Sequence, residues 1–120
     1  MQPIVYGIPN CDTIKKTLEW FRKQAIEVSF HNYKKEGITK TLLSEWIKQV
    51  GWEVLLNKKG TTWKQLSPEE QAAATDAEAV VALLAAHTSM IKRPVITFDG
   101  QVFAVGFNEP ALLDLAGKCK

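Results

Sequence analysis

Apolar residues recur along the chain with two different periods, which predict strands and helices. Short runs of branched and aromatic residues are typical of buried strands, and the first two such runs are residues 4–6 and 27–30. Between them, apolar residues at helical spacing from Ile14 to Phe21 predict a helix that ends at about Gln24. A strand, a helix and a second strand in so few residues predict a right-handed crossover between two parallel strands.

The middle of the chain carries helix-capping signals. Thr39 is a favoured N-cap for a helix whose apolar stripe ends at Gly51. Residues 67–70, Ser-Pro-Glu-Glu, have the pattern of a capping box with proline at the first helical position, and Asp76 is expected to open a further helix. Residues 52–66 are expected to place apolar anchors around a basic turn.

The last part of the chain predicts a hairpin followed by a helix. Pro94 precedes an apolar strand that runs to Phe98, and Asp99-Gly100 is a strong signal for a two-residue hairpin into a strand at 101–105. A final helix is expected from about Glu109. The order βαβ, then helices, then ββα, predicts an α/β fold with a mixed four-stranded sheet flanked by helices.

Length and charge narrow the classes of function. A chain of 120 residues can form one domain, residues 1–120, whose core needs neither disulfides nor a metal. The net charge of +2 gives no indication of nucleic-acid or membrane binding. We expect no signal peptide and no membrane span. Cys11 and Cys119 lie at opposite ends of the chain and the two histidines are far apart, which favours a cytoplasmic protein without a metal or a disulfide framework.

Cys11 carries the clearest chemical signal. The residues from Gly7 to Asn10 break the first strand, and Asn10 is a favoured N-cap, so Cys11 is predicted at the mouth of the first helix. The free N–H groups and positive dipole end there favour a thiolate, whereas the carboxylate of Asp12 opposes it. A lone cysteine can equally be a small buried apolar residue. Spacing alone leaves both interpretations open.

Three other titratable residues have simpler interpretations. His31 and His87 are expected to be capping or surface residues rather than general bases. Cys119 is expected to be an exposed, poorly ordered thiol, which could resolve an intermediate on Cys11 only if the end of the chain swung back.

Residues 34–37 are expected to form a charged turn.

Three stretches resemble a known family. They are residues 6–16 (Tyr-Gly-Ile-Pro-Asn-Cys-Asp-Thr-Ile-Lys-Lys), 51–63 (Gly-Trp-Glu-Val-Leu-Leu-Asn-Lys-Lys-Gly-Thr-Thr-Trp) and 91–95 (Ile-Lys-Arg-Pro-Val). In this order they are similar to the arsenate-reductase-related ArsC/Spx/YffB family, and most of all to its YffB-like branch. The resemblance covers essentially the whole chain. It implies a thioredoxin-like fold with an inserted helical segment at about residues 39–90.

The resemblance also implies roles for individual residues. In that family the cysteine at the position of Cys11 is the nucleophile, the arginine of the Arg93-Pro94 pair helps bind an anionic substrate, and the proline has a cis peptide bond near the cysteine. Arg93 would offset Asp12, and Thr13 could donate its hydroxyl to the sulfur. Lysines are candidates for the carboxylates of glutathione: Lys15, Lys16, Lys58 and Lys92. The residues expected to bind substrate are Asn10, Thr13, Lys15, Lys92, Arg93 and Pro94.

Some positions depart from the family pattern. Where arsenate reductases carry two further arginines, this chain has Asn57 and the pair Val105-Gly106. Arsenate favours several bidentate cations, so efficient arsenate reduction is not expected. Ile14 removes the Cys-x-x-Cys redox switch of Spx-type regulators, although residues 105–109 resemble the corresponding Spx segment.

Two functional hypotheses follow. The first is a glutathione-dependent thiol reductase in which Cys11 alone attacks an oxidised small-molecule or protein thiol and glutathione, as co-substrate, resolves the adduct. The alternative is an Spx-like regulatory protein that binds a partner through the same fold. In either case we expect a monomeric protein that does not bind nucleic acid directly, membranes or metals.

Overall fold

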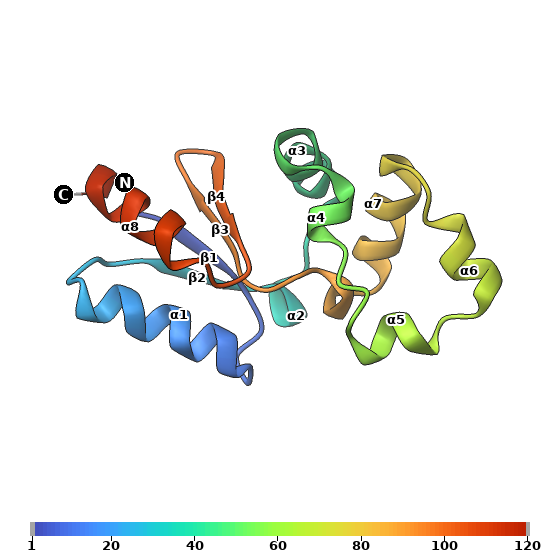
Figure 1. The fold of residues 1–120 in the computed structure, drawn as a ribbon, viewed down its shortest axis with the longest axis horizontal. Coiled ribbons are helices and arrows are strands. Elements are labelled where there is room, and N and C mark those ends of the chain that lie inside the picture. Colours follow the sequence, from blue (N-terminus) through green and yellow to red (C-terminus); the bar gives the residue numbers. More distant parts are fainter. Residues whose placement is uncertain (1, 120) are drawn as a thin grey trace. The chain divides into compact units, whose positions relative to one another are not determined.

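The computed structural model describes residues 2–119, which form two compact units (Figure 1). One unit contains the residues up to Glu36 together with those from Arg93 onward, and the other contains Gly37–Lys92. None of the helices within residues 2–119 combines the length and apolar character needed to cross a membrane.

The first unit is built on a mixed four-stranded sheet with the strand order β2-β1-β3-β4. The strands are β1 (Ile4–Gly7), β2 (Ser29–Asn32), β3 (Val95–Phe98) and β4 (Gln101–Val105). β1 and β2 are parallel, and β3 is antiparallel to both β1 and β4. The predicted α/β class and the thioredoxin-like arrangement are therefore confirmed.

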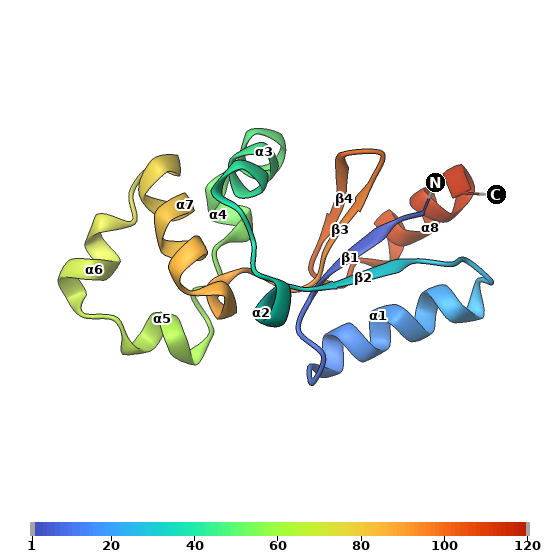
Figure 2. The same ribbon diagram turned by 180° about the vertical axis from the view of Figure 1, so that it is seen from behind.

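Two helices, α1 (Asp12–Lys23) and α8 (Glu109–Cys119), cover one face of this sheet (Figures 1 and 2). Val5 pairs with Ile96 and Ile96 pairs with Ala104, so these three side chains share a face. They form one buried cluster with residues of both helices: Ile14, Phe21, Leu112 and Leu115. The packing of this cluster holds α1 and α8 in fixed positions against β1, β3 and β4.

The hairpin between β3 and β4 has the predicted form. Asp99 and Gly100 both have positive φ, 53° and 77°, as a type I′ turn requires. The strand that was predicted at 27–30 lies two residues later, because its pairing with β1 begins at Ile4↔Ser29. The predicted N-cap Asn10 is also wrong by one residue, since Cys11 itself is the N-cap of α1.

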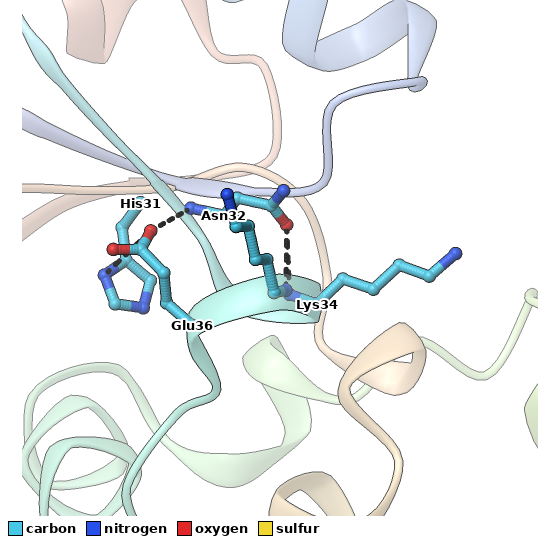
Figure 3. Close-up of polar contacts among 5 residues, drawn as sticks. His31, Asn32, Lys34 and Glu36 are labelled. Carbon is cyan, nitrogen blue, oxygen red and sulfur yellow. Dashed lines mark hydrogen bonds and ion pairs between the residues drawn. The ribbon is translucent and has the colours of Figure 1, made fainter.

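The segment after β2 is a helical turn, α2 (Tyr33–Glu36), where a charged turn was predicted (Figure 3). The side chain of Asn32 accepts hydrogen bonds from the backbone N–H groups of Lys34 and Lys35, at 3.1 and 3.3 Å. The carboxylate of Glu36 returns to accept from the N–H of Asn32 at 3.0 Å. This reciprocal capping closes one helical turn and fixes the direction in which Tyr33 leaves the strand.

The second unit is helical, as predicted for the insertion. Its elements are α3 (Lys40–Val50), α4 (Trp52–Leu55), α5 (Thr61–Gln65), α6 (Pro68–Ala73), α7 (Ala77–Ala86) and the 3-10 turn η1 (Thr88–Met90). Thr39 and Asp76 cap α3 and α7, and Ser67 forms the expected capping box with Glu70. His87 is the C-cap of α7, in agreement with its predicted capping role. The short helices α4 and α5 were not predicted.

Candidate active site

Gly7, the last residue of β1, allows the first turn of α1 to pack against the strand. A Cβ at this position would lie 2.3 Å from Cδ1 and 2.9 Å from Cγ1 of Ile14, far inside normal contact. Ile14 is 1% exposed and belongs to the core of the first unit. The contact between Gly7 and Ile14 therefore determines where the mouth of α1, and with it Cys11, is placed.

Cys11 is half-buried at the N-cap of α1, with extended φ and ψ of −123° and 127°. Its carbonyl accepts the first helical hydrogen bond, from the N–H of Lys15 at 3.0 Å. Its side chain makes no capping hydrogen bond of strict geometry, yet the backbone N–H groups of Ile14 and Thr13 interact with the sulfur. The thiol thus occupies the position where a helix terminus favours negative charge.

The electrostatic balance at Cys11 favours the thiolate. Partial burial raises the pKa of the Cys11 thiol, but the N–H groups of Ile14 and Thr13 and a hydrogen bond and positive charge from Arg93 outweigh it, so the pKa is lowered overall. A lowered pKa makes the sulfur a nucleophile over more of the neutral range. These surroundings favour the prediction of a reactive Cys11 over that of an inert buried residue.

Arg93 and Pro94 reach Cys11 from the strand antiparallel to β1. Val95 pairs with Tyr6, so the two residues before β3 lie at the end of the sheet where β1 runs into the Cys11 turn. The Arg93-Pro94 peptide bond is cis, as expected. Pro94 is buried, and its carbonyl accepts from the N–H of Gly106 at 2.8 Å. Arg93 is half-buried and its guanidinium donates to the sulfur.

Tyr33 is a third member of this group, and the sequence reasoning missed it. It is 1% exposed, and its hydroxyl is hydrogen-bonded to the guanidinium of Arg93. Burial raises the pKa of Tyr33 to about 12, although Arg93 opposes that rise. A positional signal was available: β1 and β2 are parallel, so residues that follow them meet at the same edge of the sheet.

The other predicted site residues lie in different surroundings. Thr13 is half-buried, and its carbonyl accepts from the hydroxyl of Thr17 at 2.7 Å. Asn10 and Lys15 are exposed on either side of Cys11 in the chain. Lys92 is exposed and is the last residue of the other unit, so it is not part of the group described here. The proposed hydroxyl bond from Thr13 to the sulfur stays a prediction.

Lys16 and Phe107 connect α1 with the segment after β4. The ammonium nitrogen of Lys16 lies 4.4 Å from the centroid of the Phe107 ring, within the range of a cation–π interaction. Phe107 is half-buried and packs against the core cluster. The contact joins the first turns of α1 to the segment that also supplies Gly106 to Pro94.

Cys119 does not have the disorder that was predicted for it. It is the last residue of α8, it is half-buried, and it packs against the core cluster. β4 ends beside Val95, so α8 starts near the Cys11 end of the sheet and runs back along it for 11 residues (Figure 1). At 1.5 Å per residue, α8 places Cys119 about 15 Å along the sheet from that end.

Among residues 2–119, no three or more histidine, cysteine, aspartate or glutamate side chains are grouped as they would be around a metal ion. The chemistry supported by the described residues is that of a thiolate beside a guanidinium.

Comparison with known proteins identifies relatives of the whole chain. The model of the ArsC family matches residues 6–115. A protein of Haemophilus influenzae is 42% identical over 105 residues, which are 88% of this chain and 90% of that protein. Among solved structures, a YffB protein is 36% identical with a TM-score of 0.88, over 94% of this chain and 97% of that one.

Two further structures carry names related to arsenate reduction. An arsenate reductase (ArsC) related protein from Brucella melitensis is 42% identical, with a TM-score of 0.75 and coverage of 98% and 96%. An arsenate reductase from Vibrio cholerae, with 20% identity, a TM-score of 0.76 and coverage of 100% and 98%, shares the fold. Since the family model matches most of the chain and the sheet order and relatives agree with it, the chain belongs to the ArsC family.

Proposed function

We propose that this protein is a glutathione-dependent thiol–disulfide oxidoreductase in which Cys11 is the single nucleophile. Membership of the ArsC family indicates thiol-based reductase chemistry. The observation that carries the proposal is the placement of the Cys11 sulfur against the N–H groups of Thr13 and Ile14 and the guanidinium of Arg93. These groups stabilise a thiolate, which is the form that attacks disulfides.

The proposed reaction has two balanced steps. The Cys11 thiolate attacks the glutathione sulfur of a mixed disulfide, the S–S bond breaks, and the substrate leaves as a thiolate that takes up a proton. The thiolate of a second glutathione then attacks the Cys11–glutathione disulfide. Glutathione disulfide is released and the Cys11 thiolate is regenerated. The substrate gains the two electrons that glutathione loses.

An external thiol is needed because the chain's other cysteine lies too far from the site. Cys119 packs at the far end of α8, about 15 Å along the sheet, and the sulfurs of a disulfide are only about 2 Å apart. Resolution by Cys119 would require α8 to leave the core to which Leu112 and Leu115 contribute. Glutathione is the thiol that we expect in a reducing cytoplasm.

We do not expect efficient reduction of arsenate. A dianion favours several bidentate cations, and this chain has two arginines. Arg22 lies in the last turn of α1, away from Cys11, and forms a salt bridge with Glu19. At the other positions where the resemblance implies arginine, Asn57 accepts from the N–H of Lys59 at 3.2 Å and Gly106 holds a positive φ of 84°.

The test is the alkylation rate of Cys11 as a function of pH in a Cys119→Ser variant, together with mass spectrometry after exposure to glutathione disulfide. We expect a pKa below that of a free cysteine, about 8.5, and one glutathione adduct that free glutathione removes. Cys11→Ser is the control for both measurements. An ordinary pKa with no adduct on Cys11 would exclude the catalytic proposal and favour a role in partner binding.

A further inference from the structure

Arg93 makes two contacts at the candidate site. Its guanidinium donates to the sulfur of Cys11 and is also hydrogen-bonded to the hydroxyl of Tyr33. A guanidinium presents its N–H donors in a fixed planar fork. A hydrogen bond to one of these donors therefore restricts the directions in which the remaining donors point. Arg93 is only half-buried, so packing alone does not restrict its long side chain fully.

Tyr33 is much more rigidly held than Arg93. It is 1% exposed, and no buried side-chain nitrogen or oxygen within residues 2–119 lacks a hydrogen-bond partner. Its backbone belongs to α2, which directly follows the last β1–β2 pair, Gly7↔Asn32. The position of its hydroxyl is therefore set by the sheet and by the capped turn.

The turn that carries Tyr33 is itself fixed by the side chains of the residue before it and of its last residue (Figure 3). Asn32 accepts from the N–H groups of Lys34 and Lys35, and Glu36 accepts from the N–H of Asn32. His31, which precedes this turn, has its ring centroid 5.0 Å from that of Tyr6 and its Nδ1 3.9 Å from the Glu36 carboxylate.

We propose that Tyr33 is a positioning residue, which holds the guanidinium of Arg93 against the sulfur of Cys11 before any substrate arrives. The inference rests on the proposed role of Cys11 as nucleophile. Pre-organised cations contribute more than mobile ones because they need no reorientation during the reaction. Tyr33 then acts on the thiolate only through Arg93.

Tyr33→Phe tests this role, because it removes the hydroxyl and keeps the buried ring. In the Cys119→Ser background, we expect the alkylation rate of Cys11 at a pH below its pKa to fall about threefold. This factor is somewhat smaller than the one that would correspond to the full free energy of one neutral hydrogen bond, because Arg93 keeps its charge. The matched control is Tyr6→Phe. Tyr6, in β1, is the other buried tyrosine of this unit, 7% exposed, but its hydroxyl is hydrogen-bonded to Thr97 instead. Tyr6→Phe should leave the alkylation profile unchanged.

A second comparison separates positioning from a general loosening of the site. In an Arg93→Gln background, Tyr33→Phe should have no further effect on the alkylation profile, because the residue through which it acts is absent. If Tyr33→Phe fails to fold, Asn32→Ala in both backgrounds replaces it, since removing the cap of α2 should shift the profile in the same direction.

The outcomes distinguish this inference from the proposed function. An unchanged or faster alkylation in Tyr33→Phe, or an equal effect with and without Arg93, would overturn the positioning role. Alkylation by iodoacetamide needs no glutathione, so this result stands whatever the wild type does with that thiol. Failure of the proposed function would appear without any change at Tyr33, as the absence of a glutathione adduct on Cys11 in the Cys119→Ser parent.

Discussion

The contact between Gly7 and Ile14 links stability to the position of the thiol, and Gly7→Ala tests it. The new Cβ would meet Cδ1 of Ile14 at 2.3 Å and Cγ1 at 2.9 Å, whereas unstrained carbon contacts lie at about 3.5–4.0 Å. Ile14 is enclosed by the core and is 1% exposed, so its side chain has little room to withdraw. We therefore expect overpacking to cost about 1–3 kcal/mol.

The overlap identifies a compensating substitution. Ile14→Val deletes Cδ1, the atom nearest to the new methyl group, and on its own should cost about 0.5–1.5 kcal/mol. In the double variant, the methyl group added at residue 7 can fill the space that the deleted Cδ1 of Ile14 leaves. The sum of the two single losses should therefore exceed the measured loss by about 1 kcal/mol, a coupling typical of residues in contact.

Chemical denaturation of the four proteins in the Cys119→Ser background measures this coupling. For a chain of this size, a loss of 1 kcal/mol corresponds to a fall of about 4 °C in Tm. The alkylation rate of Cys11 should fall in Gly7→Ala and recover in part in the double variant, because the methyl group moves the mouth of α1. Losses that add to within about 0.3 kcal/mol would refute the reasoning.

Three further predictions concern the thiolate and the helix that carries it. Arg93→Gln should raise the pKa of Cys11 and slow its alkylation about fivefold below that pKa, since a unit charge about 4 Å away is worth about 1 kcal/mol in solvent-exposed surroundings; an unchanged pH profile would contradict this. Because the native pKa of Cys11 is lowered, its ionisation stabilises the fold fully above the unfolded-state pKa, and this contribution is lost as the pH falls through the native value. The Tm difference between wild type and Cys11→Ser should therefore shrink on acidification, and a constant difference would count against it. Ala25 has a φ of 58° after α1, so Ala25→Gly should stabilise the protein by about 1 kcal/mol in urea denaturation, while equal midpoints would show that the site is unstrained.

Elements with strong local signals could be predicted from the sequence. The Asp99-Gly100 turn needs positive φ at two successive residues, which this dipeptide tolerates, and Phe98 pairs with Gln101 across it as a two-residue hairpin requires. The capping box at Ser67 and the caps at Thr39 and Asp76 involve residues three positions apart. In each case the decisive hydrogen bonds lie within one turn of chain.

Elements whose limits depend on distant residues could not be predicted in the same way. The helix α4 has only four residues, and the carbonyl of its last residue, Leu55, accepts from the N–H of Lys92 at 2.7 Å. The start of β2 is set by Ser29, whose N–H donates to the carbonyl of Pro3 at 2.9 Å. Neither partner is visible in a local pattern of apolar residues.

The candidate site also combines one feature that local sequence predicts with others that depend on distant residues. The position of Cys11 at a helix mouth followed from local spacing, whereas its proximity to Arg93 came from the family resemblance, because 82 positions separate the two residues. Tyr33 lacked any local signal of chemistry. Its place beside Arg93 arises only when β2 pairs with β1 and β3 pairs on the other side of β1.

The topology of the sheet also separates the two thiols of the chain. β1 ends where α1 begins, and β4 ends where α8 begins, at the same edge of the sheet, so Cys11 opens one helix at that edge. Cys119 closes the other helix, and the rise of that helix carries it away from the edge. Its packing against the core then opposes any return. In the proposed reaction, an adduct on Cys11 would consequently lie out of reach of Cys119 while the sheet is intact, and its release would depend on a thiol from solution.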